Sequence, residues 1–258
     1  MRVLISCEVG GADVPDRFIA KKWRDSLSAA PMPSVGQRKK SLRAGSLPPR
    51  LSCDEGAKHF VAALSRPLNA TVVANSFSPE LIEVSRSPHH QQLFPPATRK
   101  WSVADRKHLI DVVYDPYRMK LRETLRGMLI QSTRVLHLSV RTFPLKSPGK
   151  KKTLRRADMG LLYDPACDSE VDFCLDWIDD MYDEVPMLRV RRNYPRRGTH
   201  DCITKAMRTE FGGVGYLGVE VLLNQAWAGR QVAIRDEVIA GICWSLQGLL
   251  GEVESAAA

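Results

Sequence analysis

The sequence lacks any apolar run of the roughly 18–20 residues needed to cross a membrane, and its first residues lack the pattern of a signal peptide. Its six cysteines form no Cys-x-x-Cys pair, which argues against a zinc ribbon and against a disulfide framework. The Gly-Gly pairs are not followed by the lysine and serine of a phosphate-binding loop. We therefore expect a cytoplasmic protein with free thiols, no membrane partner and no P-loop nucleotide site.

Positive charge is in excess and is concentrated. The 38 Lys and Arg residues outnumber the 29 Asp and Glu residues, which gives a net charge of +9. Three basic stretches, at 37–43, 146–156 and 189–197, account for much of the excess. Such stretches can bind polyanions, but aromatic residues are not interleaved with them as in a surface that stacks bases. We therefore expect solvated loops and no specific nucleic-acid partner.

Strand-like runs alternate with amphipathic stretches, which is typical of the α/β class. The clearest apolar runs lie at 2–7, 135–140 and 215–223, and the longest helical patterns at 102–131 and 234–250. We predict a single domain over 1–258, built as a three-layer fold with a mixed sheet flanked by helices. A basic stretch rich in Pro and Ser, at about 29–51, is predicted to be a surface loop or an insertion.

Three local features give sharper predictions. The helical pattern at 102–131 is predicted to break before Pro116, because a residue that precedes proline disfavours the helical region. The apolar run at 81–84 is predicted to be a strand. His137 lies inside an apolar strand, where we expect a core histidine whose ring is hydrogen-bonded to the backbone.

Five short motifs follow one another in a characteristic order. They are residues 7–11 (CEVGG), 82–87 (IEVSRS), 160–165 (GLLYDP), 191–195 (RRNYP) and 216–220 (YLGVE). In this order they resemble the N-formylglutamate amidohydrolase family, and the resemblance extends over 4–225 apart from the 29–51 stretch. It implies a zinc-dependent exopeptidase-like α/β fold and hydrolysis of N-formyl-L-glutamate to formate and glutamate.

The resemblance also implies a mechanism and a set of site residues. Three protein ligands would hold zinc with an open position for water, and a carboxylate would pass the proton to the leaving amine. By this resemblance Glu220 is the candidate catalytic carboxylate and Asp54 is a candidate metal ligand. Arg86, Arg192 and Asn193 match positions that would bind a small acidic substrate, since arginine pairs well with carboxylates.

The chain departs from the family pattern where the metal would bind. The family's Cys-Glu-His-Gly-Gly has Val9 after Glu8 in this chain, and its His-Ser-Phe begins with Arg141. Leu222 stands where the family commonly has a second glutamate. Valine offers no lone pair and arginine stays protonated, so neither can bind a metal. We expect zinc-dependent activity to be lost or altered, and whether the chain holds zinc is left open.

The sequence permits two interpretations of Arg141. Its guanidinium replaces the missing cation and pairs with Asp54 or Glu8, because carboxylates that face each other without a counter-charge are costly. Alternatively, it points from the end of a strand into solvent. Arg86 and Arg192 likewise either bind an acidic ligand or form structural ion pairs.

Three functions from different classes therefore remain open. The chain is an amidohydrolase with a rearranged site, for which the thiols of Cys7 and Cys53 are possible zinc ligands. Alternatively, it is a non-catalytic homologue that binds a small acidic ligand through Arg86 and Arg192. The third possibility is an interaction protein that binds a polyanionic partner through its basic loops. The sequence leaves the oligomeric state open.

Overall fold

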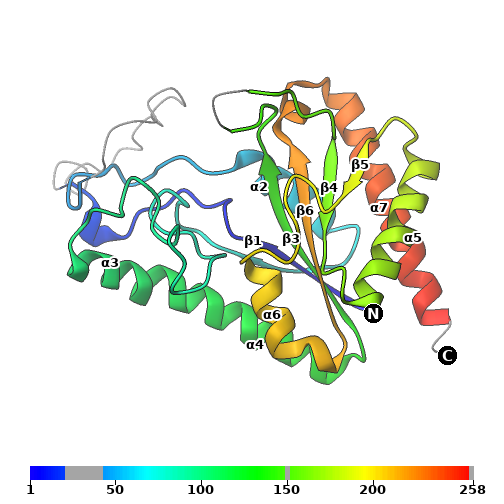
Figure 1. Ribbon diagram of the computed structural model, residues 1–258, viewed down its shortest axis with the longest axis horizontal. Helices are drawn as coiled ribbons and strands as arrows, with labels where there is room; N and C mark the ends of the chain where they lie inside the picture. Colours follow the sequence, from blue (N-terminus) through cyan, green and yellow to red (C-terminus); the bar gives the residue numbers. More distant parts are fainter. Residues whose placement is uncertain (21–42, 149–151, 256–258) are drawn as a thin grey trace.

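The computed structural model describes residues 1–20, 43–148 and 152–255 of the 258-residue chain. Within these ranges six strands form one sheet with the order β2-β1-β3-β6-β4-β5 (Figure 1). The β4–β6 pairing is antiparallel and the other pairings are parallel. The predicted α/β class with a mixed sheet is confirmed. The strands are Arg2–Cys7 (β1), Thr71–Ala74 (β2), Val135–Phe143 (β3), Met159–Leu162 (β4), Val190–Arg192 (β5) and Tyr216–Asn224 (β6).

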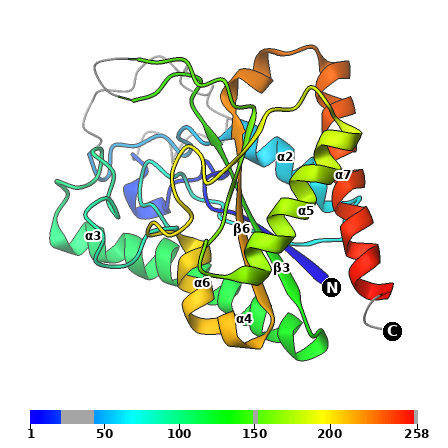
Figure 2. The same cartoon turned by 45° about the vertical axis from the view of Figure 1, so that its right-hand side comes forward.

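Helices flank the sheet on both faces (Figure 2). One face is covered by α2 (Glu55–Ser65), α5 (Asp168–Glu184) and α7 (Val232–Ser255). The other is covered by α3 (Val103–Leu109), α4 (Asp115–Gln131) and α6 (Ile203–Phe211). Short helical turns occur at Asp16–Phe18 (η1), Ile110–Tyr114 (η2), Gly212–Val214 (η3) and Gln225–Gly229 (η4). No helix in the described ranges is long and apolar enough to cross a membrane.

The alternation of side chains along each strand assigns residues to the two faces. In β1, Val3 and Ile5 pack in the core with α2, α5 and α7, whereas Leu4 packs in the core with α4 and α6. A strand that is buried on both faces needs apolar residues at consecutive positions. This explains why the central strands appear in the sequence as nearly continuous apolar runs.

The predicted helix break before Pro116 is wrong. α3 continues into η2, which is a π-helical turn, and α4 follows with Pro116 in its first turn. Proline is tolerated in the first turn of a helix because its missing N–H is not needed there. A π turn also changes the hydrogen-bond spacing just before the proline, so the helical path is kept.

The predicted strand at 81–84 is also wrong, because this segment is a buried loop. Leu81, Ile82 and Val84 are fully buried in the core beside α4, which accounts for their apolar character. The backbone N–H of Glu83 donates to the carbonyl of Leu93, at 2.9 Å. The loop thus holds Glu83 in place without any strand pairing.

Only part of the predicted loop at about 29–51 can be compared with the structure, because residues 29–42 lie outside the described residues. Leu47 and Leu51 in the remaining part are buried in the core, at 2% and 5% exposure. The N–H of Leu51 donates to the carbonyl of Ala12, at 2.7 Å. This end of the stretch is therefore attached to the segment that follows β1.

Candidate functional site

The parallel strands β1, β2, β3 and β6 end at the same edge of the sheet, where open α/β folds bind their ligands. A cavity of about 1410 Å³ lies at this edge. The start of α2, the loop at 79–100, the ends of β3 and β6, and α7 form its walls. The lining residues include the charged or polar Asp54, Glu55, Glu80, Glu83, Lys100, Arg141, Thr142 and Arg235 and the apolar Val9, Phe60, Leu223, Trp227, Val238, Ile239 and Ile242.

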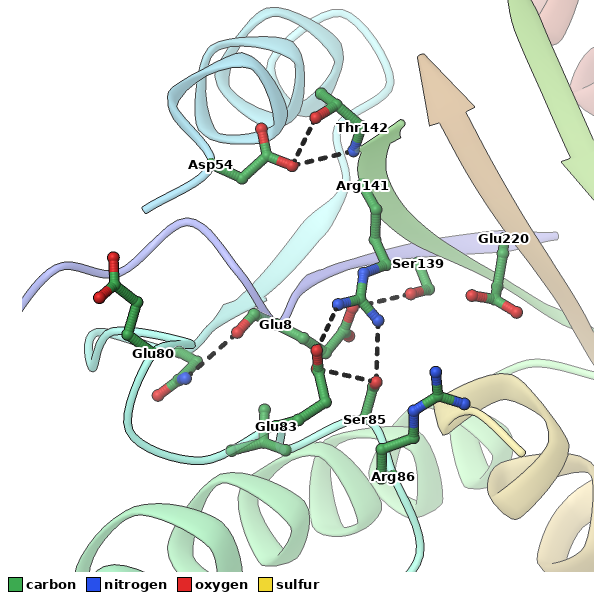
Figure 3. Close-up of polar contacts among 12 residues, drawn as sticks. Glu8, Asp54, Glu80, Glu83, Ser85, Arg86, Ser139, Arg141, Thr142 and Glu220 are labelled. Carbon is green, nitrogen blue, oxygen red and sulfur yellow. Dashed lines mark hydrogen bonds and ion pairs between the residues drawn. The ribbon is translucent and has the colours of Figure 1, made fainter. Parts of the chain in front are cut away.

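Arg141 lies on the cavity wall and is held in an ion pair (Figure 3). Its Nη2 donates to Glu83 Oε2 at 2.8 Å, and its Nη1 donates to Ser85 Oγ at 2.8 Å. Ser85 Oγ donates in turn to Glu83 Oε1, at 2.9 Å. The Arg141 side chain is only 15% exposed. Arg141 therefore does pair with a carboxylate, but that carboxylate belongs to Glu83 rather than to Asp54 or Glu8, and Arg141 does not point into solvent.

The charges of this pair stabilise each other. Burial raises the pKa of Glu83, but the charge and hydrogen bond of Arg141 outweigh burial, so the pKa lies below its ordinary value. Burial lowers the pKa of Arg141, while Glu83 and, more weakly, Glu8 raise it to a net value above the usual one. Both groups are therefore ionised at neutral pH.

Asp54 is the N-cap of α2 and also binds the end of β3. Its Oδ1 accepts the N–H of Ala57 at 3.0 Å, and its Oδ2 accepts the N–H and the hydroxyl of Thr142 at 3.0 and 2.7 Å. Both carboxylate oxygens thus already accept hydrogen bonds within the chain. These contacts fix the start of α2 to the sheet edge.

Glu8 is buried below the cavity, at 1% exposure, and accepts hydrogen bonds from three hydroxyls. Ser6 and Tyr117 donate to Oε1 at 2.6 and 2.9 Å, and Ser139 donates to Oε2 at 2.8 Å. Ser6 Oγ also contacts His137 Nε2 at 2.8 Å. The result is a buried network of neutral partners around one carboxylate.

His137 lies at the far end of this network from Glu8. Its Nδ1 is 2.7 Å from the hydroxyl of Tyr216, so both ring nitrogens contact side-chain hydroxyls rather than the predicted backbone groups. Burial lowers the pKa of His137 to about 3, and the charge of Arg208 adds to this effect. The imidazole is therefore neutral and lies in the core.

Glu220 is buried in β6 and pairs with an arginine that the motifs did not indicate. Arg196 Nη1 donates to Glu220 Oε1 at 3.0 Å, and Nη2 donates to Oε2. A buried carboxylate needs a counter-charge or hydrogen-bond donors, and Arg196 supplies both to Glu220. The sequence alone did not distinguish Arg196 from the other arginines of the 189–197 stretch.

The three residues predicted to bind an acidic ligand are not among the residues that line the cavity. Arg86 Nη1 donates to the backbone carbonyl of Asp201, and Arg192 is exposed beside the hydroxyl of Tyr163. Asn193 Oδ1 accepts the N–H of Gly198 at 2.7 Å. The cations that line the cavity include Arg141 and Arg235 instead, and no motif had indicated Arg235.

Two of the substituted positions carry apolar side chains that pack in the core. Val9 is 6% exposed, lines the cavity and accepts the N–H of Asp54 on its carbonyl at 2.8 Å. Leu222 is directly across from Arg141 in the β3–β6 pairing and packs with Phe143 and Leu162. Neither side chain offers a donor atom to a metal.

The residues present do not fit a zinc site of the family's kind. Val9 has no lone pair, Arg141 brings a positive charge, and Asp54 is engaged by Ala57 and Thr142. Across 1–20, 43–148 and 152–255, no group of three or more His, Cys, Asp or Glu side chains is placed to hold a metal ion.

The two thiols considered as replacement ligands are poorly suited to that role. Burial raises the pKa of Cys7 to about 12, and the charge of Glu8 contributes. Burial, together with a hydrogen bond and charge from Glu55, raises the pKa of Cys53 to about 12. Because the thiolate is the form that binds metals, zinc would have to displace the proton from either thiol, and this competition lowers the apparent affinity at neutral pH.

The mixed sheet with a cavity at the ends of its parallel strands defines an α/β protein whose cavity lies at the sheet edge where folds of this class bind their ligands. The family model for N-formylglutamate amidohydrolase matches residues 1–226, so the chain belongs to the N-formylglutamate amidohydrolase family. The predicted family assignment is thereby confirmed. No curated protein sequence matches the chain.

Two solved structures share the fold. One is the gene product Atu2144 from Agrobacterium tumefaciens, with a TM-score of 0.65 and 21% identity over 96% of this chain and 91% of that chain. The other is the N-formylglutamate amidohydrolase from Ralstonia eutropha JMP134, with a TM-score of 0.60 and 16% identity over 95% and 94%. The family match ends at residue 226, and α7 begins after it.

Proposed function

We propose that this chain has an N-formylglutamate amidohydrolase-like function on an N-acylated, carboxylate-bearing ligand, in a form that has lost the zinc-dependent step. The observation that carries the proposal is the Arg141–Glu83 ion pair on the cavity wall. By the family resemblance, Arg141 stands where a metal-binding histidine would be. The fixed guanidinium replaces both that ligand and the charge of the metal.

Electrostatics supports this replacement. A guanidinium at the position of a ligand repels a divalent cation, and the low effective dielectric constant of a cavity wall strengthens the repulsion. Glu83 offsets part of this repulsion, but its carboxylate oxygens already accept hydrogen bonds from Arg141 and Ser85, so they are not available as free metal ligands. Carboxylates also line the cavity, but at the position of Arg141 the wall offers N–H donors to an anionic or carbonyl group rather than a ligand to a metal ion.

Arg141 also retains the capacity to bind a ligand. A guanidinium has five N–H donors, and the contacts with Ser85 and Glu83 account for only part of them. The remaining donors suit an amide carbonyl or a carboxylate, which are the two groups of an N-acyl amino acid. Arg141 would thus orient the amide and polarise its carbonyl oxygen.

The test is calorimetric titration with N-formyl-L-glutamate in the presence of a chelator, together with elemental analysis of the purified protein. We expect binding that the chelator does not change, and no stoichiometric zinc. The double variant Arg141→Met, Glu83→Gln removes the ion pair without leaving a buried carboxylate unpaired. It should weaken binding by about tenfold, or ~1.4 kcal/mol.

Arg134→Met is the matched control, because Arg134 is exposed and precedes β3 at the opposite end of that strand from Arg141. It should bind as the unmodified chain does. About one zinc per chain, with formate release that a chelator abolishes, would overturn the proposal.

A further inference from the structure

Arg141 can meet only part of an N-acyl amino acid whose side chain is acidic. The acyl carbonyl and the α-carboxylate are attached to neighbouring atoms of such a ligand, so one guanidinium can donate to both. A carboxylate at the end of the side chain lies several bonds away and needs a second cation. Among the described residues that line the cavity, the basic side chains are His59, Lys100, Arg141 and Arg235.

The direction of the Arg141 side chain decides which of these cations can share a ligand with it. Successive residues of a strand point to opposite faces of the sheet, and Val140 packs in the core with α2, α5 and α7. Arg141 therefore points to the other face, toward Glu83 (Figure 3). His59 belongs to α2 and Arg235 to α7, and both helices cover the face away from Arg141. A ligand held by Arg141 is thus presented to the loop at 79–100.

Lys100 belongs to this loop, whose two ends are hydrogen-bonded to each other. The hydroxyl of Thr98 donates to the backbone carbonyl of Leu81 at 2.7 Å. Lys100 follows Thr98 by two residues and Glu83 follows Leu81 by two, so each is separated from this contact by at most about 7 Å of chain. The loop therefore brings Lys100 to the same wall of the cavity as the Arg141–Glu83 pair.

The ammonium group of Lys100 is free to bind a ligand. Lys100 is exposed and lines the cavity, and its side chain forms no ion pair or hydrogen bond within the described part of the chain. In contrast, the Nε of Arg235 is buried. A lysine side chain is flexible, so its ammonium can adjust to the position of a carboxylate.

We infer that Lys100 is the specificity-determining residue of the cavity: its ammonium binds the side-chain carboxylate of an acidic N-acyl amino acid, whose acyl carbonyl and α-carboxylate meet Arg141. The inference rests on the proposed function. Glu80 also lines the cavity and opposes an anion, and an exposed ion pair contributes modestly to affinity. The expected preference for an acidic side chain over its amide is therefore about fivefold.

The experiment compares N-formyl-L-glutamate with N-formyl-L-glutamine by calorimetry on the full chain. These probes have nearly the same shape and differ in charge only at the end of the side chain. The unmodified chain should bind the glutamate about fivefold more tightly. Lys100→Gln should bind the two probes equally and should bind the glutamine as the unmodified chain does. Lys100→Arg keeps the charge and should retain the preference.

Arg99→Gln is the matched control. It removes one positive charge from the neighbouring residue, which is exposed but does not line the cavity, so it should retain the preference. Arg235→Gln should retain the preference too, because Arg235 belongs to the helix on the other face. Since each variant is judged by the ratio of two affinities, a general folding defect would not produce the expected pattern.

The outcomes separate the inference from the proposed function. If the unmodified chain binds both probes equally, or if Lys100→Gln keeps the preference, the inference is overturned and the proposed function stands. Loss of the preference in Arg99→Gln or Arg235→Gln also overturns the inference. If neither probe binds to the unmodified chain, both are overturned. Loss of the preference in Lys100→Gln alone supports both.

Discussion

Glu8 and Glu83 lie near the same edge of the sheet, but they are stabilised by different partners. Glu8 is fully buried and accepts hydrogen bonds from the hydroxyls of Ser6, Tyr117 and Ser139. Glu83 faces the cavity, is 20% exposed and pairs with a guanidinium. Hydroxyls stabilise a charge without neutralising it, whereas Arg141 also supplies the opposite charge. The carboxylate at the cavity wall is thus balanced by a cation, whereas the deeper carboxylate is stabilised by neutral donors.

The largest effect should come from breaking the charged pair. Arg141→Met leaves the Glu83 carboxylate largely buried and unpaired, and it should lower the free energy of unfolding by about 3 kcal/mol. Urea denaturation followed by circular dichroism measures this loss. The double variant with Glu83→Gln should recover most of it. Unchanged stability in Arg141→Met would show that the pair has no structural role.

Removing a single hydroxyl from the neutral network should cost less. Tyr117→Phe deletes one hydrogen bond to the buried Glu8 and should lower the free energy of unfolding by about 2 kcal/mol. The control is Tyr182→Phe, because that hydroxyl donates to the carbonyl of Val190 nearer the surface, and its loss should cost about 1 kcal/mol or less. Equal losses would mean that the charge on Glu8 adds nothing to the contact.

The neutral network should also give the protein a dependence on pH. The pKa of His137 is about 3 in the folded chain, against 6.5 for an unperturbed histidine, so below pH 6.5 the unfolded chain binds a proton that the folded chain does not. Stability should therefore fall by roughly 1.4 kcal/mol per pH unit on acidification between pH 6.5 and 4.5. Below that window, protonation of Glu83, whose pKa is lowered, acts in the same direction.

Denaturation at a series of pH values checks this slope. His137→Gln keeps a polar side chain that does not titrate, and it should flatten the curve in this window whatever its overall stability. A slope that survives the substitution would assign the pH dependence to another group.

The smallest expected effect concerns Asp54, whose partners are neutral like those of Glu8. Thr142→Val removes the hydroxyl that donates to Asp54 Oδ2 and accepts from the exposed Gln225 side chain, but it keeps the backbone N–H contact with Asp54. It should lower the free energy of unfolding by about 1 kcal/mol, and thermal unfolding measures this. A loss of unfolding free energy as large as that of Arg141→Met would contradict the view that several hydrogen bonds hold Asp54 in place.

Much of the fold could be predicted because it depends on local pattern. The period of the apolar residues located the central strands and the helix that became α7. The run at 81–84 was misassigned because burial by a loop produces the same apolar composition as burial in a strand. The helix break expected before Pro116 does not occur. The spacing of apolar residues in a sequence does not reveal a π-helical turn such as the one that precedes this proline.

The site was predictable only in part. The resemblance implied that Val9, Asp54, Arg141 and Glu220 belong to one site. The first three line the cavity, whereas Glu220 is not among the lining residues. They did not indicate that Glu83 would be the partner of Arg141, because the loop that carries Glu83 is placed by long-range packing. The pairing of Glu220 with Arg196 was missed for the same reason.

The contacts that hold Arg141 also affect the entropy of binding. A free arginine side chain has about 2 kcal/mol of rotamer entropy to lose when it is ordered. Glu83 and Ser85 restrict this side chain when the chain folds, so little of that loss is left for the moment when a ligand arrives. A ligand that reaches the polar wall therefore meets a guanidinium already in position, and tight binding does not require the cavity to close around it.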